Sequence, residues 1–147
     1  MTVDPLGRFE AEHVEALAAL DRLEAAAVAL EGGEAPDRHL GVVREVHAVL
    51  SGAVREHNEN EERVLFPLLG DDAPTATFVE EHLTLRQLEH HLRRAADGPD
   101  PRRRVPPLAH QIVELLRAHI ARENDVLFPM ARALLGAEGL ALVARRL

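Results

Sequence analysis

The sequence predicts an all-α protein: an antiparallel, up-down-up-down four-helix bundle with a short extra helix at the C-terminus, over about residues 137–147. Three observations support this fold. The 147 residues include no Trp or Tyr and only 3% aromatic residues, and they are rich in Ala, Leu, Glu and Arg, which favour helix over sheet. Apolar residues recur at the three-, four- and seven-residue spacings of a helix face. Segments with Gly and Pro separate four such stretches, and a chain of this length is expected to form one domain, residues 1–147.

Two long helices are predicted in the first half of the chain. Asp4 is a candidate N-cap before Pro5, so the first helix should begin at Pro5 and end near Leu30, just before a Gly-Gly pair. A second N-cap candidate, Asp37, should start a helix that continues to about Leu69. In both helices the apolar stripe is interrupted by polar residues, and these interruptions are the main functional signal of the sequence.

Two further helices are predicted in the second half. A turn at residues 70–74 should lead into the third helix, which ends near Ala96 before a Gly-Pro pair. An Arg- and Pro-rich segment, Asp100–Arg104, is expected to be a linker. The fourth helix would then carry Pro106-Pro107 in its first turn, where proline is tolerated, and would end at Gly136.

The second and fourth helices contain a repeat, His57–Pro67 and His119–Pro129. In each copy a His precedes a Glu by four residues, and Val-Leu-Phe-Pro follows. Residues four apart lie on one face of a helix, so each copy can present an imidazole and a carboxylate to one point. The pairs Glu12-His13 and Glu81-His82 show that the first and third helices also resemble each other. The chain therefore consists of two similar helical hairpins.

Six polar residues interrupt the core stripes and should meet in one layer. At 1.5 Å per residue, His13 and His82 lie roughly 12 Å from the starts of their helices, and Glu61 lies roughly 12 Å from the end of its helix. In an antiparallel bundle those starts and ends share one end of the molecule. Unpaired charges in a core are very costly, so a compensating cation is expected. The six residues are His13, His57, Glu61, His82, His119 and Glu123.

The chemistry of these six residues points to two metal ions. Nitrogen and carboxylate ligands without sulfur suit iron or manganese, and four His with two Glu exceed what one tetrahedral zinc can use. Two metals bridged by the two Glu satisfy all six side chains.

This constellation resembles the hemerythrin family, and most closely the hemerythrin-like (HHE cation-binding) domains. The resemblance rests on a His on the first and third helices and a His-x-x-x-Glu on the second and fourth, and it spans about residues 9–130. It implies a non-haem di-iron centre with oxo, hydroxo or dioxygen ligands. The cofactor expected from it is two iron ions, with Mn or Zn as possible substitutes.

The third helix departs from the family's oxygen carriers, which have His-x-x-x-His there. Phe78 and Arg86 stand four residues on either side of His82, so one imidazole is missing. Four His, two bridging Glu and an oxygen bridge fill ten of the roughly twelve positions of two octahedral ions. Glu81, which holds a core position on its helix, could fill one more, as an acidic residue beside this His does in some hemerythrin-like domains. Glu81 is therefore the seventh predicted ligand.

The composition excludes several other classes of function. The formal net charge is −8, and every basic residue is Arg, which argues against a nucleic-acid-binding protein. Cysteine is absent, which excludes disulfides, iron–sulfur clusters and thiol nucleophiles. We find neither a basic start followed by an apolar run nor an apolar stretch near 18 residues. We therefore expect a cytoplasmic protein without a membrane segment.

The resemblance leaves three functional hypotheses open. The first is a binding protein that carries O2 or senses O2 or iron. The second is an enzyme that decomposes peroxide or handles nitric oxide, since replacing a neutral His by a carboxylate should stabilise the ferric state and weaken reversible O2 binding. The third is a structural bundle without metal. The expected small ligand is O2, peroxide or nitric oxide, and the sequence identifies no protein partner.

Overall fold

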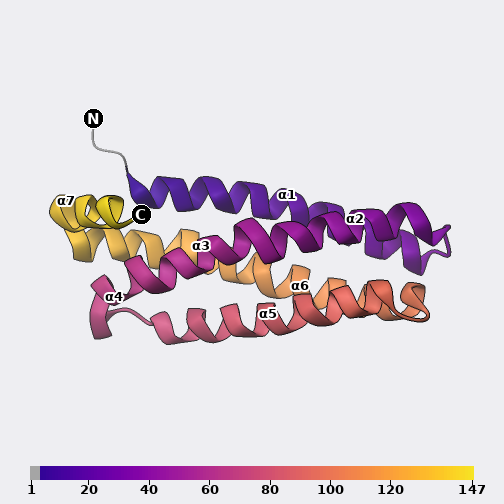
Figure 1. Ribbon diagram of the computed structural model, residues 1–147. Coiled ribbons are helices and arrows are strands. Elements are labelled where there is room, and N and C mark those ends of the chain that lie inside the picture. Colours follow the sequence, from indigo (N-terminus) through magenta and orange to yellow (C-terminus); the bar gives the residue numbers. More distant parts are fainter. Residues whose placement is uncertain (1–3) are drawn as a thin grey trace.

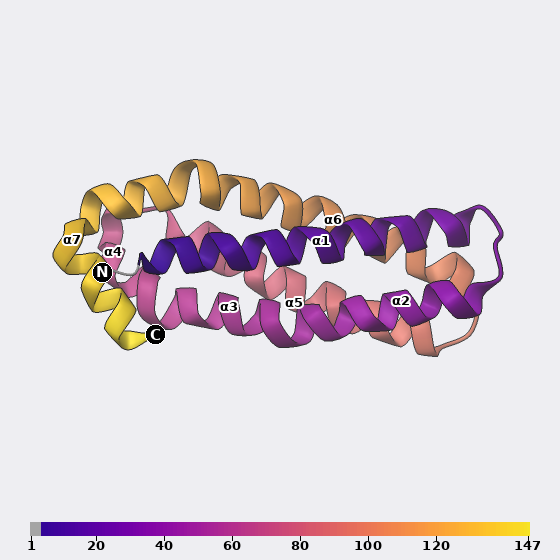
Figure 2. The same ribbon diagram turned by 90° about the horizontal axis from the view of Figure 1, so that it is seen from above.

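The computed structural model describes residues 4–147, and every regular element among them is helical. The predicted all-α class is confirmed, while residues 1–3 of the predicted domain lie outside the described residues. Figure 1 shows four long helical rods side by side, and Figure 2 shows the same rods from above. Each rod packs against two neighbours, because α1 contacts α2 and α6 while α5 contacts the same two helices. Short connections join successive rods at the ends of the molecule.

The four rods are built from the following elements. The first rod is α1 (Pro5–Glu31) and the third is α5 (Thr75–Asp97). The second rod contains α2 (Pro36–Val49), a π-helical turn (Leu50–Val54), α3 (Arg55–Asn60), a second π-helical turn (Glu61–Leu65) and α4 (Phe66–Leu69), followed by a 3₁₀ turn (Gly70–Asp72). The fourth rod contains α6 (Pro101–Arg122), a π-helical turn (Glu123–Leu127) and α7 (Phe128–Arg146).

The helix starts agree only partly with those predicted. Asp4 caps α1 as expected, with its carboxylate accepting a hydrogen bond from the Leu6 N–H at 3.1 Å. Asp37 is not the cap of α2, because the helix already begins at Pro36, whose ring presets the helical φ angle. Asp37 lies instead in the first turn, where its charge interacts favourably with the positive end of the helix.

The predicted linker at residues 100–104 was wrong, because α6 begins at Pro101. Asp100 takes a left-handed conformation with φ of 55° and turns the chain, and Pro101 then occupies the first helical position. Pro106 and Pro107 therefore lie inside the helix rather than in its first turn. Val105 and Pro106 are buried, and their apolar contacts offset the backbone hydrogen bonds that the two prolines cannot make.

Two matching π-helical turns were not predicted. One begins at Glu61 and the other at Glu123, and each ends just before a Phe-Pro pair. A proline inside an α-helix lacks the N–H donor and clashes with the carbonyl four residues earlier. The wider π-helical turn accommodates Pro67 and Pro129 while the rod continues past them. Both copies of the repeat thus have a specialised backbone at the residue predicted to bridge two metals.

The core consists of two apolar clusters separated by a polar layer. The larger cluster fills one end of the bundle and contains residues such as Leu23, Leu92 and Ile112. The smaller cluster closes the other end and contains the four Phe side chains. On the first rod, Phe9 belongs to the smaller cluster and Ala16 to the larger one. His13 lies between them, and the other three rods repeat this order.

The C-terminal segment forms the predicted extra helix across one end of the bundle. Gly136, with φ of 63°, breaks the regular helix inside α7, and the chain returns to helical conformation up to Arg146. Only a residue that tolerates positive φ fits this bend. Figures 1 and 2 show the segment after the bend lying across the ends of the rods. Its Val143 is fully buried in the smaller cluster.

Among the described residues, one helical stretch, Pro101–Arg146, is long and apolar enough to cross a membrane by length and composition alone. Its most apolar window has a mean hydropathy of 1.6, and 22% of that window is buried. Core helices of soluble proteins pass the same test, so a single such stretch does not place the protein at a membrane.

We predict that the C-terminal segment contributes to the stability of the bundle. Val143→Asp would put a carboxylate without a partner into the smaller cluster, which should lower the free energy of unfolding by at least about 2 kcal/mol. The neighbouring substitution Ala144→Asp places the same charge at an exposed position and should change it by less than about 0.5 kcal/mol. Urea unfolding of both variants measures the difference. Equal effects would show that the segment does not pack on the bundle.

Candidate metal centre

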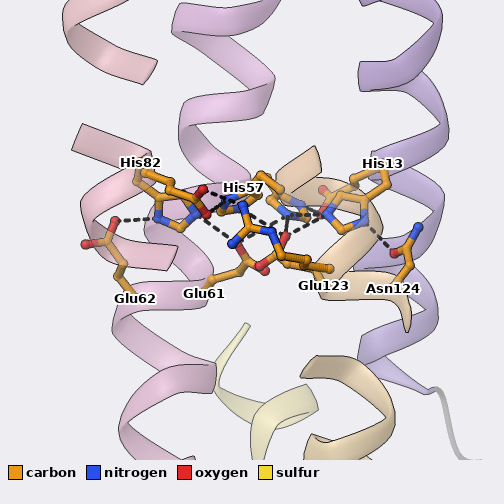
Figure 3. A network of polar contacts seen from close by, with 11 residues as sticks. His13, His57, Glu61, Glu62, His82, Glu123 and Asn124 are labelled. Atoms are coloured by element: carbon orange, nitrogen blue, oxygen red, sulfur yellow. Dashed lines mark hydrogen bonds and ion pairs between the residues drawn. The ribbon is translucent and has the colours of Figure 1, made fainter. Parts of the chain in front are cut away.

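The structure brings the six predicted side chains together in one layer. His13 comes from α1, His57 from α3, His82 from α5 and His119 from α6. The two Glu are the first residues of the π-helical turns Glu61–Leu65 and Glu123–Leu127. Figure 3 shows the side chains of His13, His57, Glu61, His82 and Glu123 pointing toward one centre. All six are buried, and Glu61 and Glu123 have no exposed surface at all.

The layer contains two overlapping groups of ligand atoms that share both carboxylates. In each group the candidate ligand atoms lie within 4.8 Å of one another. The members common to both groups are Glu61 and Glu123, and each group adds one pair of histidines. The imidazole centroids lie 4.7 Å apart in one pair and 4.9 Å apart in the other. The first pair is His13 with His57, and the second pair is His82 with His119.

Every histidine directs its Nε2 atom at the shared carboxylates. His13 Nε2 lies 3.0 Å from Glu123 Oε1, and His119 Nε2 lies 3.3 Å from the same oxygen. On the other side, Glu61 Oε1 lies 3.5 Å from His57 Nε2 and 3.3 Å from His82 Nε2. Each carboxylate thus faces one histidine of each pair, which is the arrangement required of a group that bridges two metals.

Several inner atoms of the layer are buried without a hydrogen-bond partner. They include both oxygens of Glu61, Oε2 of Glu123, and Nε2 of His82 and His119. A buried polar atom without a partner costs roughly 1–3 kcal/mol, and more when it is charged, so such atoms are rare in folded proteins. Their lone pairs all face the centre of the layer, where metal cations would satisfy them. The donor set of nitrogen and carboxylate oxygen fits iron or manganese.

The comparison with known families agrees with this geometry. The model of the hemerythrin HHE cation binding domain matches residues 4–131, which include all four rods and the six side chains of the layer. The chain belongs to this family. No curated protein and no solved structure matches it.

An outer ring of hydrogen bonds orients the four imidazoles of this hemerythrin-like centre. Each Nδ1 atom contacts an oxygen of another side chain. When Nδ1 carries the proton and donates a hydrogen bond to that oxygen, the lone pair of Nε2 is directed at the centre. Three of the four partners are carboxylates and one is an amide. The contacts are His13 with Asn124 at 2.7 Å, His57 with Glu12 at 3.0 Å, His82 with Glu62 at 3.1 Å, and His119 with Glu81 at 3.1 Å.

The structure does not bring Glu81 into the layer as the seventh predicted ligand. Its Oε1 accepts a hydrogen bond from His119 Nδ1, its Oε2 pairs with Arg122, and it belongs to neither group of ligand atoms. Neighbouring residues on a helix point about 100° apart. Because His82 points at the centre, the adjacent Glu81 projects from the flank of α5 and reaches the outer side of another imidazole.

Sequence reasoning missed the three other partners in this ring. Glu12, Glu62 and Asn124 were assigned no role, although each lies beside a predicted ligand in the chain. The 100° step between helix neighbours that displaces Glu81 also places these three beside an imidazole of an adjacent rod. The sequence signal that could have identified them is a polar residue directly beside a predicted ligand on each rod. Metal-binding histidines usually have such a hydrogen-bond partner on their second nitrogen.

All four Phe residues of the chain form a floor beneath the imidazoles, one contact for each ring. Phe128 stacks on His13 and Phe66 stacks on His82, with interplanar angles of 13° and 12°. The other two contacts are edge-on, Phe9 with His57 and Phe78 with His119. This floor excludes water from one side of the centre.

A partly open cavity of about 60 Å³ reaches the centre. Its walls include His13, His57, His119 and Glu123, together with the small side chains Ala16 and Ala53. A cavity of this size holds one or two small molecules. It therefore provides room for a diatomic ligand or peroxide beside the centre, between the first, second and fourth rods.

The carboxylates change the protonation of the centre before metal binds. Burial alone would lower the pKa of His57, but its hydrogen bond to Glu12 and its closeness to the two central carboxylates raise it to about 11. Burial and the charge of Glu123 raise the pKa of Glu61 well above 4.5. His57 therefore holds a proton at neutral pH until a metal ion displaces it.

We predict that the metal-free protein loses stability as the pH rises above 6.5. A group with a raised pKa in the folded state contributes its full stability below its unfolded pKa, and this contribution disappears as the pH passes the folded pKa. For His57 that window runs from 6.5 to about 11. The chain has no Lys, Cys or Tyr to titrate in the same range. Thermal unfolding of chelator-treated protein should therefore show a melting temperature that falls with pH.

The variant His57→Gln should flatten this dependence. His91→Gln is the matched control, because that imidazole is exposed and lies outside the layer, and it should leave the slope unchanged. A wild-type melting temperature that rises across the window, or an unchanged slope in His57→Gln, would contradict the protonation described for the centre.

Proposed function

We propose that this protein is a non-haem di-iron protein that binds O2, or senses O2 or iron, at a carboxylate-bridged centre. The observation that carries the proposal is the pair of fully buried carboxylates shared by two histidine pairs, with inner atoms that have no protein partner. Membership of the HHE cation-binding family supports a cation at this position. The proposal takes the four rods as an antiparallel, up-down-up-down bundle, since this order lets the starts of α1 and α5 meet the two π-helical turns.

The donor count leaves room for a small ligand. Two imidazole nitrogens and one oxygen from each Glu give each metal four protein donors, so about two of six octahedral positions remain open. Iron in such a centre supplies reversible O2 binding or the one- and two-electron chemistry of O2 and peroxide. Manganese and zinc accept similar donors and are the expected substitutes.

The chain's own residues determine what reaches those open positions. The cavity beside the first histidine pair has apolar walls such as Val49, Leu116 and Ile120, which admit small neutral molecules more readily than anions. On the opposite side of the layer, the Phe floor closes the end of the bundle. The outer ring of hydrogen bonds keeps the four imidazoles in one orientation, so that metal and ligand binding need little rearrangement.

An enzyme that decomposes peroxide or handles nitric oxide is the second candidate function. Phe78 and Arg86 stand four residues on either side of His82, so this helix lacks the further imidazole of the oxygen carriers and the shell has fewer neutral nitrogen ligands. Fewer neutral nitrogen ligands for the same two carboxylates should stabilise ferric iron and weaken reversible O2 binding. This observation favours redox turnover over simple O2 transport.

We expect protein produced with sufficient iron to contain two irons per chain. His57→Ala and Glu123→Ala should each lower the iron content to one or less, because each removes a ligand from a group of only four side chains. His110→Ala, at the surface, is the control and should keep both irons. Metal analysis and the visible spectrum of the purified proteins measure the outcome. Two metals retained in both ligand variants, or none in the wild type, would contradict the proposal.

Turnover of excess peroxide separates the two candidate functions. The iron-loaded protein is mixed with peroxide and O2 evolution is compared with that of the same concentration of free iron. Evolution well above free iron, lost in Glu123→Ala, supports the enzyme. A rate no higher than free iron, together with a reversible spectral change on adding and removing O2, supports the binding protein or sensor.

A further inference from the structure

We infer that the two metal positions of the centre are unequal, and that the position held by His82 and His119 binds its metal more tightly. The cause is one difference in the outer ring: the Glu62 carboxylate contacts His82, whereas the Asn124 amide contacts His13. This inference rests on the proposed function, because it concerns the relative metal affinities of the two positions in that centre.

The two halves of the centre are otherwise closely matched. The repeat relates His57 to His119, and each of these imidazoles contacts a Glu from the other rod of its own hairpin, at 3.0 and 3.1 Å. Each of those two Glu has an Arg beside it. Glu12 lies 3.9 Å from Arg8, whereas Glu81 accepts a hydrogen bond from Arg122. Each position therefore has one outer carboxylate with an Arg nearby, and the Arg lies closer at the second pair.

The match ends at the residues that follow the two central carboxylates. Glu62 follows Glu61, and its Oε2 lies 3.1 Å from the Nδ1 of His82. Asn124 follows Glu123, and its Oδ1 lies 2.7 Å from the Nδ1 of His13. No Arg pairs with Glu62 among the described residues. The outer ring therefore has two carboxylates at the position of the second histidine pair and one at the position of the first pair.

The amide of Asn124 can only accept a hydrogen bond at this place. If its nitrogen donated to His13 Nδ1, the proton of that ring would lie on Nε2, which points at Glu123 and at the metal position. A protonated Nε2 cannot bind a metal. The oxygen of Asn124 therefore faces His13, and it orients the ring as Glu62 does without supplying a charge.

A carboxylate that accepts a hydrogen bond from the Nδ1 of an imidazole makes the metal-binding Nε2 more basic. Losing such a partner lowers metal affinity about 10- to 100-fold. The first metal to bind should therefore occupy the position of His82 and His119. The more weakly held metal would lie at His13 and His57, two imidazoles that line the cavity. The metal at His82 and His119 would then stay bound, and the metal at His13 and His57 would exchange more readily.

Zinc binding to the chelated full-length protein tests this inference without any activity measurement. Crystals grown with one equivalent of Zn²⁺ are examined by anomalous diffraction, which gives the occupancy of each position. In the wild type we expect an occupancy at least about tenfold higher at the position of His82 and His119. This measurement needs no variant, so it does not depend on whether a substituted protein folds.

Two isosteric variants then test the cause. Asn124→Asp supplies the missing carboxylate and should bring the two occupancies to within about threefold of each other, and Glu62→Gln should do the same by weakening the tighter position about 10- to 100-fold. The matched controls are Glu59→Gln, which removes an exposed charge from the same rod, and Gln111→Glu, which adds one to α6 at an exposed position. Both controls should keep the wild-type preference.

The outcomes separate this inference from the proposed function. Zinc at both positions with equal occupancy, or with the preference reversed, would overturn the inference and leave the two-metal centre intact. A wild-type preference that persists in Asn124→Asp and Glu62→Gln would overturn the assignment to this pair of residues. Zinc at neither position would overturn the proposed function itself.

Discussion

The structure depends on two fully buried carboxylates, Glu61 and Glu123, that face each other and four imidazoles in the middle of an apolar bundle. Such a layer is stable only if positive charge compensates it, either as protons on groups such as His57 or as metal cations. Each rod contributes to the layer at one height, and apolar clusters lie on both sides of it. The need to bring all six side chains to that height therefore sets how the four rods align along the bundle.

The surroundings of the layer restrict its chemistry from three directions. The Phe floor closes one side, the larger apolar cluster closes the other, and the cavity between the first, second and fourth rods leaves a path for small molecules. The outer ring of hydrogen bonds holds each imidazole by its Nδ1 atom. The matching π-helical turns place both carboxylates at the end of a regular helix and just before the proline that would otherwise disturb it. A duplicated hairpin thus yields a nearly symmetric centre, and Asn124 opposite Glu62 is the difference that breaks the symmetry of the outer ring.

Much of this arrangement could be predicted from the sequence, because buried polar residues interrupt regular apolar stripes. The helical class follows from the spacing of the apolar residues, and the end of the regular helix at Gly136 follows from its glycine. The meeting of the six polar side chains follows from their distances along the rods. The errors arose where one residue decides between two local conformations. Asp100 turns the chain earlier than the prolines suggested, so residues 101–104 are helical. The position of Glu81 depends on side-chain direction across two rods, which a stripe of one helix cannot reveal. The π-helical turns depend on a balance of backbone hydrogen bonds around a proline that composition does not encode.

X-ray absorption at the iron edge of the loaded wild-type protein tests the central claim most directly, because it reports the neighbours of the metal itself. Two carboxylates shared between two metals require a second iron at no more than about 4 Å, with only nitrogen and oxygen in the inner shell. We predict such an iron neighbour in every preparation that contains two irons per chain. Iron bound without a second metal within that distance would contradict a shared carboxylate centre, and the six buried side chains would then need another explanation.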